Sequence, residues 1–221
     1  MQARYRTDYA GEFVITETKW SSGKKEQTRE WIENPIENQH LSHRAACIGS
    51  SVNRDQFFNY QILQRHRGGL LSSKKLQTYG TGEIAHEMRL DFAVELNAEK
   101  LEILKEQKYD ETNILYTSAR NCLANPGCFY LIPHTPHFQT EVTPVYLAAF
   151  DGHEEIFLLG YTNDTPLEGT RWINELSEIM SAYSSTQFFI VGEKTNLPTK
   201  FFDSSNVQKM SYREFIGYCD V

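Results

Sequence analysis

The feature that most limits what this chain can fold into is a repeated alternation of short apolar runs with polar, helix-like segments. After residue 43 the apolar runs are 45–48, 92–94, 114–116, 129–132, 156–159 and 188–191, and 76–79 and 207–210 are two further short strand-like runs. Short apolar strands that alternate with helices are typical of a parallel sheet covered on both faces. We therefore expect a Rossmann-like three-layer α/β/α fold with a mostly parallel sheet over residues 44–221.

The segments between the runs contain helix signals. Residues 56–66, 99–107, 143–150 and 168–183 are predicted helices. Thr143 is the expected N-cap of the third, with Pro144 at its first helical position. Ser211 followed by Glu214 is a capping-box pattern, which predicts the start of a closing helix.

Residues 1–43 differ from the rest of the chain. Residues 12–20 alternate apolar and polar side chains, residues 21–24 interrupt the pattern, and residues 26–32 resume it. This pattern predicts an N-terminal β-hairpin with an aromatic face of Phe13, Trp20 and Trp31. We expect the hairpin to lie against the main body and to offer an exposed edge to another copy of the chain, forming a homo-oligomer.

Composition excludes several classes of protein. Hydrophobic residues make up 40% of the chain and charged residues 23%, which suits a folded core rather than a disordered chain. The apolar runs fall far below the ~18 residues of a membrane span, and the first residues lack the apolar core of a signal peptide. No cysteine pair has C-x-x-C spacing, so free thiols in a cytoplasmic protein are expected, with Cys47 buried.

The net charge of −7 argues against binding of extended nucleic acid. Neutralisation of phosphates supplies most of the affinity for a duplex, and it requires a positive surface. A small basic pocket for a nucleotide is still compatible with this charge.

Three predicted strands end in small residues that expose the backbone. They are Gly49-Ser50-Ser51, Gly80-Thr81-Gly82 and Gly160-Tyr161-Thr162. Ligands of open α/β sheets bind beyond the carboxyl ends of the strands, and glycine lets a phosphate approach the main chain. Neither G-x-G-x-x-G nor a Walker A motif is present. The coincidence of three such loops nevertheless predicts a nucleotide site at these residues.

Further polar residues follow the predicted strands. Glu95 and Asn97 end the third strand, where an acidic side chain can accept ribose hydroxyls. Asn53, Arg54, Arg120 and Tyr161 are candidates to face the phosphates of a departing nucleotide.

Histidines supply the candidate general base. His134 and His137 follow a strand, and an imidazole suits removal of a proton from an acceptor hydroxyl. The alternative is a metal site completed by Glu141, but the neighbouring prolines oppose a helical arrangement, and no metal is expected. His40, His86 and His153 have no evident partner and are expected at the surface.

Residues 44–54, 145–150 and 154–161 together resemble the sialyltransferase-like nucleotide-binding proteins. That group includes bacterial surface-glycan sialyltransferases, proteins similar to 6-hydroxymethylpterin diphosphokinase, and small phage-encoded relatives. The resemblance extends over about residues 44–217. It implies a nucleotide-binding fold, transfer of a sugar from a nucleotide donor, a histidine base, and the host cytoplasm as the location of a phage protein.

The sequence departs from the family pattern at two loops. The family's first loop usually reads Gly-Asn-Gly-Pro-Ser, whereas this chain has Gly49-Ser50-Ser51-Val52-Asn53. Its late strand commonly ends Gly-x-Asp, whereas this chain has Gly160-Tyr161-Thr162 with Asp164 two residues later. These departures bear on catalysis more than on fold.

Three functions stay open at this point. The first is a glycosyltransferase-like protein that binds a nucleotide or nucleotide sugar, with donor and acceptor unspecified. The second is a non-catalytic nucleotide-binding or virion-associated phage protein, which the altered loops favour. The third is a nuclease or DNA-modifying enzyme, which the acidic net charge and the lack of a P-D…E-x-K pattern disfavour.

Overall fold

The computed structural model describes residues 13–21, 23–32, 42–50, 76–133, 138–161, 171–193 and 197–219. Its central feature is a sheet of eight parallel strands in the order β10-β9-β8-β3-β4-β5-β6-β7. The strands are β3 (Arg44–Ile48), β4 (Gln77–Thr81), β5 (Phe92–Val94), β6 (Ile114–Thr117), β7 (Tyr130–Leu131), β8 (Glu155–Leu159), β9 (Gln187–Val191) and β10 (Val207–Met210). The expected Rossmann-like fold is confirmed.

β3 lies in the middle of this sheet and pairs with β4 on one side and β8 on the other. The strands β4 to β7 extend outward from β3 in chain order, and β8 to β10 extend in the opposite direction. The strand order therefore reverses between β3 and β8, which is the switch point at which open α/β sheets bind ligands.

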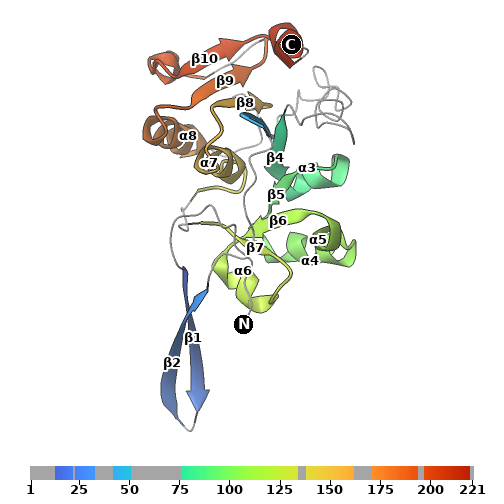
Figure 1. Cartoon of the computed structure of the whole chain (residues 1–221), viewed down its shortest axis with the longest axis vertical. Coiled ribbons are helices and arrows are strands. Elements are labelled where there is room, and N and C mark those ends of the chain that lie inside the picture. The colour runs from blue at the N-terminus through green and yellow to red at the C-terminus, as the bar shows by residue number, and fades with distance from the viewer. Residues whose placement is uncertain are drawn as a thin grey trace.

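Helices cover both faces of the sheet (Figure 1). They are α3 (Gly82–Glu87), α4 (Ala98–Glu106), α5 (Tyr109–Thr112), α6 (Ala119–Ala124), α7 (Thr143–Phe150), α8 (Arg171–Ala182) and α9 (Tyr212–Cys219), with a 3-10 turn η1 (Thr199–Phe202). Apolar residues of α7, α8 and η1 belong to one core cluster, and those of α3, α4, α6 and α9 belong to a second.

The alternation of side chains along β3 explains why its run of residues is apolar throughout. Ala45 and Cys47 pack into the first cluster, whereas Ala46 and Ile48 pack into the second. Successive side chains of a strand point to opposite faces, so a strand covered on both sides can be apolar at consecutive positions.

Two helix starts test the local sequence signals. The Ser211 backbone N–H and hydroxyl both donate to Glu214 Oε2 at 2.7 Å, and Ser211 Oγ accepts from the Glu214 N–H at 3.2 Å, so the predicted capping box is confirmed. α7 begins one residue earlier than predicted. Its N-cap is Val142, Thr143 is its first residue, and the Thr143 hydroxyl donates to the Gln139 carbonyl.

The predicted hairpin is present as β1 (Phe13–Ser21) and β2 (Lys24–Ile32), paired antiparallel from Phe13↔Ile32 to Ser21↔Lys24. Figure 1 shows it extending away from the α/β body, not lying against it as expected. Pairing with another copy stays a prediction. The predicted helix over 56–66 lies outside the described residues. Among the helices that are described, none is long and apolar enough to cross a membrane.

Candidate functional site

The loops after β3 and β8 touch at the carboxyl edge of the sheet. The Gly49 N–H donates to the Leu159 carbonyl at 2.7 Å. A Cβ atom on Gly49 would lie 2.7 Å from the Gly160 carbonyl oxygen and 3.1 Å from Cδ2 of Tyr161. Gly160 itself has φ of 77°, which favours glycine. Two of the predicted glycine loops thus meet at the switch point.

The loops after β4 and β5 are packed together in the same manner. A Cβ atom on Gly82 would lie 2.7 Å from Glu95 Oε2 and 3.0 Å from Cδ1 of Leu104. On Gly80 it would lie 2.9 Å from Cδ1 of Leu90. Close packing within the protein is therefore sufficient to explain why glycine is present at positions 80 and 82.

Glu95 is a buried carboxyl group at this edge. It is only 2% exposed, and its Oε1 accepts a hydrogen bond from the Asn97 backbone N–H at 2.8 Å. Burial raises the pKa of Glu95, an effect that the Asn97 N–H and the Lys100 ammonium partly offset and that Glu141 reinforces. A desolvated carboxyl with specific partners at a strand end is the kind of group found in functional sites.

Asn97 has a structural role that its position just before a predicted helix could have indicated. Its side-chain oxygen accepts hydrogen bonds from the Glu99 and Lys100 backbone N–H groups at 2.8 and 3.2 Å. It thereby caps α4 and satisfies donors that would otherwise be free to meet a ligand. Asn97 acts at this site by fixing the position of Glu95.

Tyr161 is fully buried rather than presented to solvent. Its hydroxyl donates to the Glu141 carbonyl at 2.8 Å, which ties the loop after β8 to the segment before α7. Burial raises its pKa well above the usual value, and the neighbouring Cys47 and Glu141 add to the effect. The hydroxyl hydrogen is engaged within the protein.

Thr81 ends β4 and is 4% exposed. Its hydroxyl oxygen is buried and has no hydrogen-bond partner among the described residues. Although Thr81 is the N-cap of α3, its side chain makes no capping hydrogen bond. Buried hydroxyls normally have a hydrogen-bond partner. The Thr81 hydroxyl is therefore a candidate to form a hydrogen bond with a ligand.

The other predicted site residues fall into two groups. Ser50 is half-buried just beyond β3, and Arg120 is exposed on α6. The second group lies outside the described residues, so the roles of its members stay predictions: Ser51, Asn53, Arg54, His134, His137 and Thr162.

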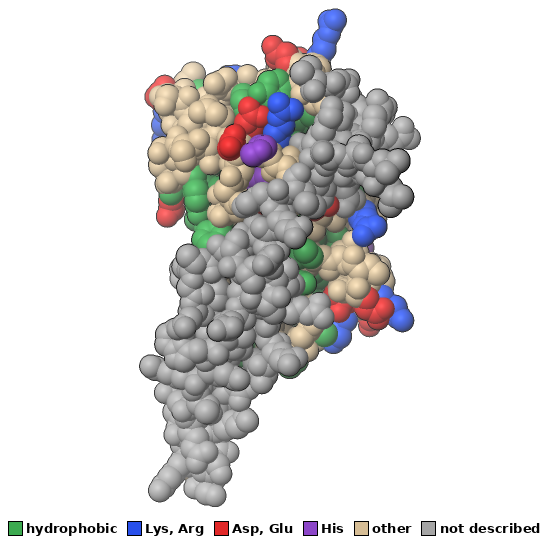
Figure 2. Space-filling model, viewed as in Figure 1, with side chains coloured by type: hydrophobic (Ala, Val, Ile, Leu, Met, Phe, Trp, Pro, Cys, Tyr) green, Lys and Arg blue, Asp and Glu red, His purple; other side chains and the backbone are tan. Residues whose placement is uncertain are grey.

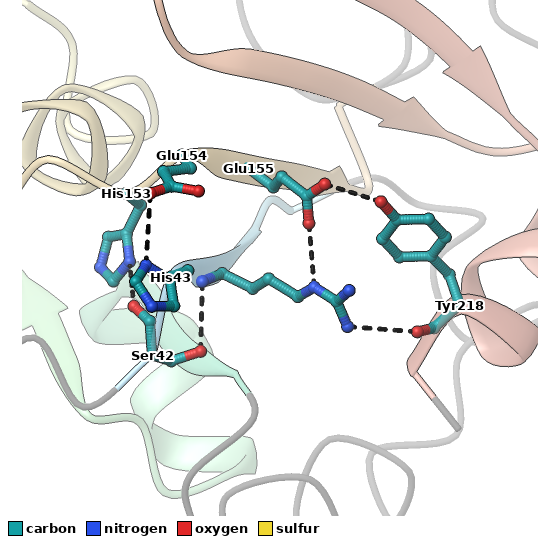
Figure 3. Close-up of polar contacts among 7 residues, drawn as sticks. Ser42, His43, His153, Glu154, Glu155 and Tyr218 are labelled. Carbon is teal, nitrogen blue, oxygen red and sulfur yellow. Dashed lines mark hydrogen bonds and ion pairs between the residues drawn. The ribbon is translucent and has the colours of Figure 1, made fainter. Parts of the chain in front are cut away.

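The prediction that His153 lies at the surface is wrong. The residue is 1% exposed. Its Nε2 is 2.9 Å from the Tyr79 hydroxyl. Its Nδ1 is 2.9 Å from the Ser42 carbonyl (Figure 3). Tyr79 is 74 positions away in the chain, so no local pattern could reveal this contact.

His153 belongs to the amino-terminal ends of β3 and β8, opposite the candidate site. There Arg44 Nε donates to Glu155 Oε2 at 2.9 Å, and the Tyr218 hydroxyl donates to Glu155 Oε1 at 2.6 Å (Figure 3). An exposed pair of His43 and Glu154 lies beside them at 3.4 Å. The visible surface of the molecule accordingly shows adjoining basic, acidic and histidine side chains (Figure 2).

Within the described part of the chain, no three His, Cys, Asp or Glu side chains are grouped closely enough to hold a metal ion. What the fold and this edge define is a Rossmann-like parallel α/β protein with packed glycine loops at its switch point. Comparison with protein-family models, curated proteins and solved structures found no match to this chain.

Proposed function

We propose that this protein binds a nucleotide or nucleotide sugar at the carboxyl edge of its sheet, around the switch point between β3 and β8. The observation that carries the proposal is the contact between Gly49 and Gly160, because it brings two glycine loops together at the place where such folds bind ligands. The resemblance of residues 44–217 to sialyltransferase-like proteins supports the same ligand class.

The described residues suggest a division of roles within this proposal. The Glu95 carboxyl, held by the Asn97 N–H, would accept hydrogen bonds from ribose hydroxyls. The Thr81 hydroxyl would gain from the ligand the partner that it lacks within the described protein. Arg54, which lies outside the described residues, and Arg120 would contribute positive charge near the phosphates.

Sugar transfer to an acceptor hydroxyl is the activity that we propose for the bound nucleotide sugar. His134 or His137 would take the proton of the hydroxyl as the new glycosidic bond forms and the nucleotide leaves. Binding without transfer is the second candidate, and the departure of Gly49-Ser50-Ser51 from the family's loop favours it.

Thermal unfolding in the presence of nucleotides and nucleotide sugars tests the binding. A ligand at 100 times its dissociation constant stabilises the folded state by about 2.7 kcal/mol. The stabilisation should be lost in Thr81→Val and Glu95→Gln and kept in Glu154→Gln, an exposed control at the opposite edge. No stabilisation by any ligand, or equal stabilisation of all the variants, would contradict the proposal.

Glu95→Gln should remain folded, because the Gln amide oxygen can still accept from the Asn97 N–H. Release of free nucleotide from a nucleotide sugar that stabilises the protein then separates the two candidates. If the release of free nucleotide disappears in His134→Ala, in His137→Ala or in both, the result supports sugar transfer. Binding without release supports the second candidate.

A further inference from the structure

We propose that Tyr79, Asp151 and His153 form a buried network that takes up one proton when the chain folds, so that the folded state weakens as the pH rises through neutrality. The three side chains are 0%, 1% and 1% exposed. They come from β4, from the turn after α7, and from the residues just before β8. They lie at the amino edge of the sheet, away from the proposed nucleotide site.

The hydrogen bonds fix how many protons the network holds. His153 Nδ1 is 2.9 Å from the Ser42 carbonyl, which can only accept, so Nδ1 carries a hydrogen. The Tyr79 hydroxyl oxygen is 2.5 Å from Asp151 Oδ2 and 2.9 Å from His153 Nε2. Each of these two contacts also requires a hydrogen between its atoms. The folded network therefore holds three protons.

Two arrangements with a neutral tyrosine hold three protons. Both give the same dependence of folding stability on pH. In one, an imidazolium donates to Tyr79 and Tyr79 donates to the Asp151 carboxylate. In the other, a protonated Asp151 donates to Tyr79 and Tyr79 donates to a neutral imidazole. The proton moves along the chain between these forms without entering or leaving it.

The unfolded chain holds fewer protons at neutral pH. Above about pH 6.5 its histidine is neutral, its tyrosine is protonated and its aspartate is ionised, which leaves two protons on the three groups. Folding then takes up one proton, and the folded state loses stability as the pH rises. Between about pH 4 and pH 6.5 the unfolded chain also holds three, and this dependence disappears.

Several described titratable groups lie near the network, and those with a raised pKa also take up protons on folding wherever they are ionised in the unfolded chain. Cys47 of β3 has a raised pKa because of burial and the nearby Asp151. Burial, reinforced by Asp151, likewise raises the pKa of Tyr183, which follows α8, and that of Tyr146 of α7. Glu155 and Arg44 are paired with each other at the same edge, as are His43 and Glu154 at the surface.

Asp151→Asn is the decisive variant, because an amide can make the same hydrogen bonds with no extra proton. The Asn NH₂ donates to Tyr79, Tyr79 donates to Nε2, and Nδ1 donates to Ser42. Denaturant unfolding of the full chain from about pH 5 to pH 8 should show the wild-type folding constant falling, relative to that of Asp151→Asn, about tenfold per pH unit, or about 1.4 kcal/mol. Asp203→Asn, at an exposed position, should show no such trend.

A wild-type measurement keeps the test independent of how well the variant folds. Refolding at about pH 8 in lightly buffered solution with a pH indicator should consume close to one proton per chain through this network. If Asp151→Asn folds, it should lack that uptake. A pH-independent ratio of the two folding constants, or wild-type refolding without proton uptake, would overturn the proposal.

Discussion

The guanidinium of Arg44 lies over the ring of Tyr218, with Cζ 4.6 Å from the ring centroid. The same two residues share Glu155, which pairs with Arg44 Nε and accepts from the Tyr218 hydroxyl. Arg44 Nη1 also donates to the Tyr218 carbonyl at 3.3 Å. The closing helix α9 is thereby attached to β3 and β8 in the middle of the sheet.

Removal of this attachment should weaken the fold. Arg44→Met leaves Glu155, which is 24% exposed, without its charged partner, and should reduce the free energy of unfolding by about 1–2 kcal/mol. Tyr218→Phe keeps the ring and loses one hydrogen bond, at a cost of about 1 kcal/mol. Denaturant unfolding of the single and double variants should show non-additive losses. Strict additivity would mean that the contacts act independently.

A side chain at position 49 should disturb the switch point even when it is as small as a methyl group. A Cβ atom 2.7 Å from the Gly160 carbonyl forces the backbone to move, so Gly49→Ala should cost about 1–3 kcal/mol of stability. Any loss of nucleotide binding in a variant of Gly49 would therefore include this structural effect.

Gly217→Ala is the matched control for Gly49→Ala. Gly217 lies within α9, and a Cβ atom there would meet nothing within 4 Å. Alanine favours helix more than glycine does, so this variant should gain about 0.5–1 kcal/mol. Thermal unfolding that ranks Gly217→Ala above the wild type and Gly49→Ala below it would agree with the packing. Equal stability of the two variants would contradict it.

Asn206 should tolerate no carboxylate. It is 2% exposed, and its Nδ2 donates to the carbonyls of Met180, Tyr183 and Thr186 at 3.0, 3.3 and 3.1 Å. Asn206→Asp replaces the donor with an oxygen facing three oxygens, and should cost more than about 3 kcal/mol at neutral pH. Ser205→Ala, an exposed neighbour, should unfold as the wild type does.

The contribution of Glu214 should depend on pH. The Ser211 backbone N–H, followed by the Ser211 hydroxyl, lowers the pKa of this exposed carboxyl. A lowered folded-state pKa means that the stabilisation is present above the unfolded-state value of about 4.3 and is lost as the pH falls through the folded-state value. The stability difference between the wild type and Glu214→Gln should therefore shrink as the pH is lowered. A difference that stays constant from neutral to strongly acidic pH would contradict this expectation.

Local signals predicted the local structure well. The apolar runs predicted most of the strands, because strands of a parallel sheet buried on both faces are rich in apolar residues. The capping box at Ser211 and Glu214 fixed a helix start through contacts only three residues apart. The strand ends also indicated where Gly49 and Gly160 meet.

Long-range contacts were beyond such signals. Histidine is a polar residue type that is often exposed, so His153 was expected at the surface. Only the folded sheet brings Tyr79 and Ser42 to its ring. Asn97 was missed for a different reason: its side chain makes a local cap on α4, and an asparagine at a strand end suits either a cap or a ligand contact. The alternation of the hairpin predicts its two strands but not its direction relative to the α/β body (Figure 1).

The central position of β3 has a consequence for synthesis of the chain. Its partner on one side, β4, follows soon after, but the contact of Arg44 with Glu155 in β8 spans 111 positions. At roughly 5–20 residues per second, a ribosome needs roughly 5–20 seconds to supply that second partner. During this interval β3 is an edge strand of the growing sheet, with its backbone N–H and C=O groups unpaired on that side. A central strand of the finished sheet is thus an edge strand in the nascent chain, where its unpaired backbone groups are open to a chaperone.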